Sequence, residues 1–161
     1  MKLYHGSNVQ VREPKILESV RTLDFGTGFY LTSDYEQAKK WAILKQKRNN
    51  SGVALISVFE IDENVFKELS TLKFNEPNKE WLNFVCNNRK NIKIENNYDF
   101  IIGPVANDNT MPVINWYLQG RYDEQDALKR LMPQKLKNQY VCKTEKAISK
   151  LKYEEVIVVD E

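Results

Sequence analysis

The stretch between Leu23 and Trp41 constrains the fold more than any other part of the chain. Two glycines that lie two residues apart, Gly26 and Gly28, come directly before the apolar triplet Phe29-Tyr30-Leu31. Glycine adopts positive φ angles and lets a ligand approach the main chain closely, and an apolar run after a glycine turn is typical of a strand. The stretch therefore predicts a loop and a short strand that border a ligand site. A glycine turn that leads into a half-buried strand, without a ligand, is the alternative interpretation.

A helix is predicted directly after this strand, because Ser33 and Glu36 have the spacing of a capping box. The expected helix covers residues 33–48. Its apolar positions fall close to one helical stripe, formed by Tyr35, Ala38, Trp41, Ala42 and Leu44. Trp41 is then either a core residue or, together with Tyr30, part of the wall of one cavity.

The rest of the chain alternates between short strands and short helices. Strands are predicted at residues 2–4, 53–61, 98–105, 139–142 and 155–159, and helices at 79–88, 110–120, 123–132 and 144–151. The apolar run at 53–61 is the strongest and is expected at the centre of the sheet. The irregular alternation predicts an α+β fold rather than a regular βαβ winding. A chain of 161 residues can bury one core, so a single domain over residues 1–161 is expected.

Composition excludes several classes of protein. The net charge of +2, from 24 basic and 22 acidic residues, gives no global field that would attract nucleic acid, although a local basic patch is compatible with it. Cys86 and Cys142 have neither the spacing of a metal site nor that of a disulfide framework. No apolar run reaches the length of a signal peptide or of a membrane span. We therefore expect a cytoplasmic protein with no metal and no membrane partner.

The chain contains one histidine, His5, at the end of a short apolar strand and directly before Gly6-Ser7. Three blocks then follow in order: His5-Gly6-Ser7, Gly26-Thr27-Gly28-Phe29-Tyr30-Leu31, and Trp41 eleven residues after Tyr30. This order resembles the ADP-ribosyltransferase superfamily, in particular its diphtheria-toxin-like and poly-ADP-ribose-polymerase-like branch with a His-Tyr-Glu signature. The resemblance implies an ADP-ribosyltransferase-like fold, with two packed twisted β-sheets that form a cleft and helices at the periphery.

The third block of that branch departs from the expected pattern. Its Asn-Glu-Tyr-Ile-Val run corresponds here to residues 138–142, so Gln139 stands where the catalytic glutamate would be. A glutamine can hydrogen-bond to a ribose hydroxyl, but it cannot carry negative charge or take up a proton. Glu145 and Glu154 lie nearby in sequence without matching the motif, and Ala38 replaces a serine that holds the nicotinamide amide in the polymerases.

The resemblance also implies roles for individual residues, with NAD as the substrate. His5 would bind the adenosine-side ribose, and the Gly6 main chain would pair with the nicotinamide amide. Tyr30 and Trp41 would stack on the nicotinamide ring, and Gln139 would contact the nicotinamide-side ribose. The implied catalytic residues are His5, Tyr30 and Gln139, and the implied NAD-binding residues are His5, Gly6, Ser7, Gly28, Tyr30, Trp41 and Gln139.

Each of these residues also has a purely structural interpretation. His5 could stabilise the end of a strand, and Gln139 could be a polar residue of an edge strand. Arg12 and Arg21 could meet the pyrophosphate of NAD or be ordinary surface charges. The polar loop at residues 19–24 is expected to fold over the cleft.

Two functions remain open at this point. The first is a mono-ADP-ribosyltransferase that modifies a protein or nucleic-acid acceptor, as the toxin of a toxin–antitoxin or defence system with a neutralising antitoxin protein as partner. The second is an ADP-ribosyltransferase-like module that binds NAD, a nucleotide or a partner protein without turnover. The His5, Tyr30 and Trp41 set favours the first function, and Gln139 favours the second. If the rest of the site is competent, Gln139→Glu is expected to raise NAD cleavage.

Overall fold

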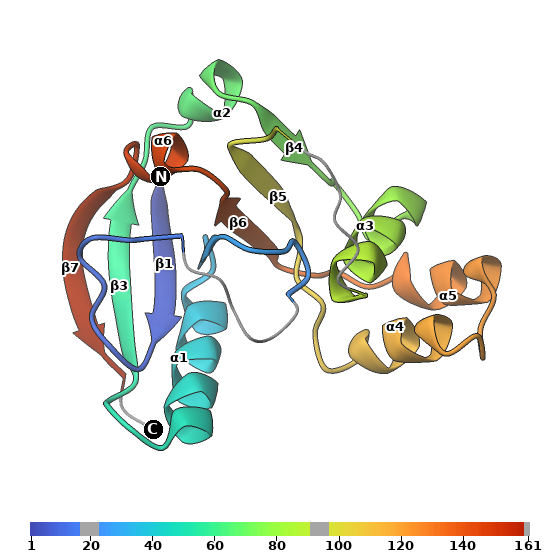
Figure 1. Ribbon diagram of the computed structural model, residues 1–161. Coiled ribbons are helices and arrows are strands. Elements are labelled where there is room, and N and C mark those ends of the chain that lie inside the picture. The colour runs from blue at the N-terminus through green and yellow to red at the C-terminus, as the bar shows by residue number, and fades with distance from the viewer. Residues whose placement is uncertain (17–22, 91–96, 160–161) are drawn as a thin grey trace.

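The computed structural model describes residues 1–16, 23–90 and 97–159 (Figure 1). The strands are β1 (Lys2–Ser7), β2 (Phe29–Thr32), β3 (Leu55–Glu60), β4 (Thr71–Lys73), β5 (Phe100–Pro104), β6 (Asn138–Cys142) and β7 (Lys152–Val158). The helices are α1 (Tyr35–Asn49), α2 (Val65–Glu68), α3 (Lys79–Arg89), α4 (Met111–Leu118), α5 (Glu124–Leu131) and α6 (Glu145–Ile148). The predicted α+β class is therefore confirmed, whereas α2 and β4 were not anticipated from the sequence.

The strands form one sheet in the order β4-β5-β6-β2-β1-β3-β7, not the two packed sheets that the resemblance implied. Its two halves meet between β1 and β2, where Tyr4 and Thr32 are the one registered pair. All four residues of β2 pair with β6, but one of them pairs with β1, so β1 and β2 separate beyond that pair. The sheet is thus continuous in its hydrogen bonding but divided in shape, with β1, β3 and β7 on one side of Figure 1 and β4, β5 and β6 on the other.

The position of β3 also differs from the expectation. Its six residues pair with β1 on one side and with β7 on the other, so β3 is next to an edge strand and not at the centre. Its inner residues are all buried, which explains its strong apolar pattern. A strand covered on both faces has this pattern wherever it lies in the sheet, and the pattern alone does not fix its place.

Helix α1 packs on β1 at very short range. A Cβ atom on Gly6 would lie 2.1 Å from the main-chain oxygen of Ala38 and 2.8 Å from the nitrogen of Ala42. Both alanines are fully buried, in one cluster with Ile56 and Val58 of β3. Gly6 is therefore required for this contact, and Ala38 belongs to the core.

The start of α1 lies two residues later than predicted. Asp34, not Ser33, is the N-cap, and its carboxylate accepts a hydrogen bond of 2.8 Å from Gln37 N. A carboxylate at this position satisfies a free amide and opposes the positive end of the helix dipole. Lys137 adds an ion pair with Asp34 at 3.2 Å. The caps expected at Asp123 and Thr144 are both present.

The second half of the sheet carries α3, α4 and α5, which Figure 1 shows beside β5 and β6. Their core contains Phe25, Trp81, Ile101, Ile114, Leu131 and Val141, all without exposed surface. No helix in the described part of the chain has the length and apolar character needed to cross a membrane. Arg21 and residues 19–22 of the predicted loop lie outside the described residues.

Candidate functional site

A cavity of about 810 Å³ lies where β1 and β2 separate, within the range of ligand pockets in proteins. The ends of β1 and β2, the glycine loop before β2, one face of α1 and the middle of the sheet border it. The seven residues that the resemblance implied for NAD binding line this cavity: His5, Gly6, Ser7, Gly28, Tyr30, Trp41 and Gln139. The fold therefore brings together four segments that are far apart in the sequence.

His5 bridges the gap between the separating strands. Its Nδ1 lies 2.7 Å from the main-chain oxygen of Tyr30, and its ring stacks on Phe29 at 4.3 Å between centroids. Because a carbonyl oxygen only accepts, Nδ1 carries the proton and Nε2 keeps its lone pair. Burial lowers the pKa of His5 to about 4, against the opposing effect of the Tyr30 bond. The ring is thus neutral near pH 7, and no described residue donates to its Nε2.

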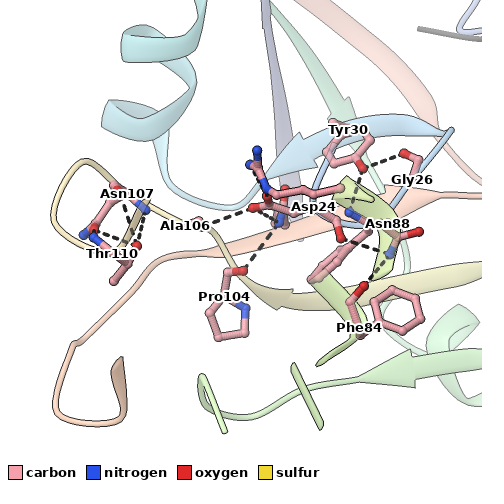
Figure 2. A network of polar contacts seen from close by, with 12 residues as sticks. Asp24, Gly26, Tyr30, Phe84, Asn88, Pro104, Ala106, Asn107 and Thr110 are labelled. Atoms are coloured by element: carbon pink, nitrogen blue, oxygen red, sulfur yellow. Dashed lines mark hydrogen bonds and ion pairs between the residues drawn. The ribbon is translucent and has the colours of Figure 1, made fainter. Parts of the chain in front are cut away.

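The hydroxyl of Tyr30 forms hydrogen bonds with the main chain of the glycine loop before β2. It donates to the oxygen of Gly26 at 2.6 Å and accepts from the nitrogen of Phe25 at 3.0 Å. Burial raises the pKa of this hydroxyl well above its usual value. Tyr30 therefore contributes the surface of its ring to the cavity, whereas its hydroxyl fixes the loop that follows Asp24 (Figure 2).

Lys143, directly after β6, holds the same loop from the other side. Its Nζ donates to the oxygen of Phe25 at 2.7 Å and to that of Thr27, and burial lowers its pKa to about 8. A Cβ on Gly28 would lie 2.5 Å from Cγ1 of Val141. Close packing of the loop against β6 therefore requires a glycine at residue 28. The sequence suggested a different reason for this glycine, namely the close approach of a ligand to the main chain.

The residue that sequence reasoning missed is Asp24, whose side chain is 6% exposed and lines the cavity. Its Oδ1 accepts from Arg89 Nε at 2.9 Å and also from a terminal nitrogen of that guanidinium. Its Oδ2 accepts from the nitrogen of Ala106 at 3.3 Å. Asn88 donates to its main-chain oxygen at 3.1 Å (Figure 2). The end of α3 thus fixes both the backbone and the charge of Asp24, and no spacing in the sequence links the two segments.

Gln139 lies in β6 opposite Gly103 of β5 and Thr32 of β2, and is 3% exposed. It is therefore an inner-strand residue, not a polar residue of an edge. Its Nε2 lies 3.5 Å from Asp24 Oδ2 and 3.4 Å from the oxygen of Pro104. Both neighbours only accept, which assigns the NH2 group to this position. The Oε1 atom has no donor among the described residues.

Trp41 lies on the face of α1 that borders the cavity, together with Leu44, Lys45 and Arg48 at helical spacing. It is half-buried and belongs to none of the apolar clusters of the described core. The structure gives no direct ring contact between Trp41 and Tyr30 in the described chain. Trp41 is thus placed as a cavity wall rather than as core packing.

The mouth of the cavity is positively charged. Among the described residues, the exposed charged residues of the lining are Arg12, Lys15, Lys45 and Arg48 against Glu13, four cations minus one anion, an excess of three. Arg89 and Asp24, which also belong to the lining, neutralise each other. Arg12 also lies over the ring of Tyr153 at 5.2 Å. Such an excess of cations, in a concave site, attracts an anionic ligand.

Other residues considered from the sequence lie elsewhere. Glu145 and Glu154 are not part of the cavity lining, and Glu154 pairs with Lys2 at 3.6 Å. Cys86 and Cys142 are both free and buried. Among residues 1–16, 23–90 and 97–159, no cluster of histidine, cysteine and carboxylate side chains is placed to hold a metal ion.

Comparison with known proteins gives one match. A protein-family model described as "Protein of unknown function (DUF3990)" matches residues 1–153. No curated protein matches the chain, and no solved structure matches it.

Proposed function

The chain belongs to the DUF3990 family, whose description states no activity. From its cavity we propose that it is an NAD-dependent mono-ADP-ribosyltransferase, with a variant of the ADP-ribosyltransferase-like fold in which the two halves are joined between β1 and β2 into one hydrogen-bonded sheet. The observation that carries the proposal is the pair of acceptors in one cationic cavity. His5 is held through Nδ1 and Gln139 through Nε2, and no described residue donates to the remaining atoms, His5 Nε2 and Gln139 Oε1. Hydroxyl groups suit two acceptors, and phosphates suit the cationic mouth.

A ribonucleotide combines these two kinds of group. NAD has a ribose at each end of a pyrophosphate, and its nicotinamide ring offers a flat surface for the rings of Tyr30 and Trp41. Stacking of this kind contributes roughly 0.5–1.5 kcal/mol per aromatic pair beyond area burial.

In the proposed reaction the bond between nicotinamide and its ribose breaks, and the pyridinium ring takes the electron pair and leaves as neutral nicotinamide. The ribose carbon passes through an oxocarbenium-like state, as in glycoside hydrolysis. A nucleophilic atom of the acceptor then bonds to this carbon and releases its proton to water. The protein contributes mainly by fixing the geometry of the ribose, which is an effective means of lowering such a barrier.

The alternative function is an NAD-binding module without turnover. One observation favours it: the carboxylates in the described lining are Glu13 and Asp24, and Asp24 is bound by Arg89. The described lining therefore has no unpaired buried carboxylate that could take up a proton from an acceptor. The identity of the acceptor, protein or nucleic acid, and a role as the toxin of a toxin–antitoxin pair stay predictions.

The test is incubation of the purified protein with a whole-cell lysate and NAD that carries a radioactive phosphate in its adenylate half. Transfer predicts label in macromolecules, and digestion by protease or by nuclease identifies their class. His5→Ala should abolish the labelling, whereas Lys39→Ala, on the same α1 helix but outside the cavity lining, should not. Binding of NAD without labelling or nicotinamide release would favour the binding module instead.

A further inference from the structure

The Asp24 carboxylate and the Gln139 amide form a buried pair at the inner end of the cavity. Oδ2 of Asp24 lies 3.5 Å from Nε2 of Gln139, and both side chains are less than a tenth exposed. Arg89 is bound to the other oxygen of the same carboxylate. Arg89, Asp24 and the amide of Gln139 therefore form a continuous series of polar contacts, with the Asp24 carboxylate in the middle.

This contact fixes which way the amide points. Nε2 is directed at Asp24 Oδ2 and at the oxygen of Pro104, which lies 3.4 Å away and also accepts from the indole of Trp81 at 3.0 Å. A rotation of the amide by 180° would place Oε1 against two acceptors and cost both hydrogen bonds. Gln139 is therefore held with Nε2 toward the protein interior, so its acceptor Oε1 is the end left for a ligand in the cavity.

We propose that Asp24 is a positioning residue that supplies the negative charge of the site and orients Gln139, so that Oε1 accepts a hydroxyl group of the nucleotide. A carboxylate on the N–H side of an amide draws electron density toward its oxygen, because hydrogen bonds in a chain polarise one another. Gln139 thus acts as a strengthened neutral acceptor. The role of this acceptor toward a ribose rests on the proposed function, whereas the coupling between residues 24 and 139 does not.

The pair also explains why residue 139 is an amide. A glutamate there would put two carboxylates side by side in a buried place, and like charges at this distance do not both ionise readily. The negative charge is already present on Asp24, with Arg89 as its counter-ion. From this contact we expect Gln139→Glu to weaken the binding of NAD, whereas the sequence-based expectation that it raises NAD cleavage stays a prediction.

A double-mutant cycle tests the coupling, with Gln139→Glu, Asp24→Asn and the double variant Asp24→Asn/Gln139→Glu. The two readouts are the thermal midpoint between pH 5 and 8 and the affinity for NAD. Gln139→Glu should lose about tenfold or more in affinity, and its midpoint should fall as pH rises and the second carboxylate ionises. The double variant should recover most of both, because the pair again contains one carboxylate, now at residue 139 and beside an amide at residue 24 that can donate to it. Gln125→Glu, exposed on α5, controls for the added charge.

Two outcomes would overturn the proposal. In the first, Gln139→Glu keeps wild-type affinity and a wild-type pH profile while Asp24 is present. In the second, the double variant is no better than the worse single variant. If the wild type does not bind NAD, the proposed function fails, but the pH dependence of the midpoint still decides whether Asp24 and residue 139 are coupled. If Asp24→Asn or the double variant does not fold, the pH dependence of the thermal midpoint of Gln139→Glu still tests the coupling by itself.

Discussion

The ring of His5 and the main-chain oxygen of Tyr30, 2.7 Å apart, join the two strands at the place where their backbone pairing ends. The bond takes the position of a ladder hydrogen bond, so the sheet opens here without leaving this carbonyl unpaired. It also fixes the tautomer of the histidine, with Nε2 as an acceptor. A structural role and a ligand-binding role for His5 are therefore compatible.

The protonation of His5 can be followed by NMR without overlap from other histidine resonances, because the chain has one histidine. Its pKa is about 4 in the folded protein, against 6.5 for the free side chain. The Hε1 resonance should therefore show a titration midpoint near pH 4 and stay constant between pH 6 and 8. A midpoint near 6.5 would contradict a half-buried ring that is neutral at pH 7.

The same shift predicts how stability changes with pH. Between pH 6.5 and 4 the unfolded chain binds a proton at His5 and the folded chain does not. The free energy of unfolding should therefore decrease as pH falls through this window and level off below pH 4, as far as His5 contributes. The contribution is the difference between wild type and His5→Gln in urea unfolding curves measured at pH 4, 5 and 7. A constant difference over that range would contradict it.

Tyr30→Phe should destabilise the protein through the glycine loop. The nitrogen of Phe25 and the oxygen of Gly26 would each lose a partner, and an unsatisfied buried polar group costs about 1–3 kcal/mol. We expect the free energy of unfolding to fall by about that amount in chemical denaturation. The control is Tyr35→Phe, whose hydroxyl makes no hydrogen bond within the described chain and whose ring packs edge-on against Tyr4. Equal stability of the two variants would show that the hydrogen bonds of the Tyr30 hydroxyl do not stabilise the glycine loop.

Gly6→Ala tests the contact between β1 and α1. The added methyl group would meet main-chain atoms of Ala38 and Ala42 that belong to a helix and cannot turn aside. Overpacking of this kind costs about 1–3 kcal/mol or more. Gly120→Ala is the comparison, since its Cβ would meet no atom within 4 Å but its φ of +78° costs roughly 1–2 kcal/mol by itself. A smaller loss for Gly6→Ala than for Gly120→Ala would show that the strand and helix are less closely packed.

Arg48→Glu tests the charge at the mouth of the cavity. It changes the excess of three positive charges in the lining to one, so NAD affinity should fall roughly tenfold, the effect of about 1.4 kcal/mol. The loss should shrink as salt is raised, because exposed charges are screened. Lys39→Glu, on the same helix outside the cavity, should have little effect. Equal losses in both variants would argue against a specific anion site.

The sequence predicted the local elements well and their assembly less well. Glycine spacing, apolar alternation and capping residues are local signals, so the strand at Phe29, the helix after it and the caps at Asp123 and Thr144 could be predicted. The single sheet and the place of β3 depend on which strands pair, and that information is not local. The three-residue strand β4 pairs in parallel with β5 and carries too short a pattern to detect.

The site shows the same division. Short motifs were enough to select residues that the fold brings to one cavity, including Gln139 in the inner strand β6. They did not predict Asp24, because its importance comes from Arg89, which lies 65 residues away in sequence. They also did not predict that the Tyr30 hydroxyl is occupied by the loop. Contacts of this kind appear only when the two segments are placed in space.

We propose that NAD binds in the cavity between β1 and β2, against His5. Titration of the protein with NAD, observed at the Hε1 resonance of its one histidine, tests this claim most directly. We predict a saturable shift of this resonance at pH 7 that is lost in Gln139→Ala and kept in Gln125→Ala. An unchanged His5 resonance up to millimolar NAD would contradict the claim.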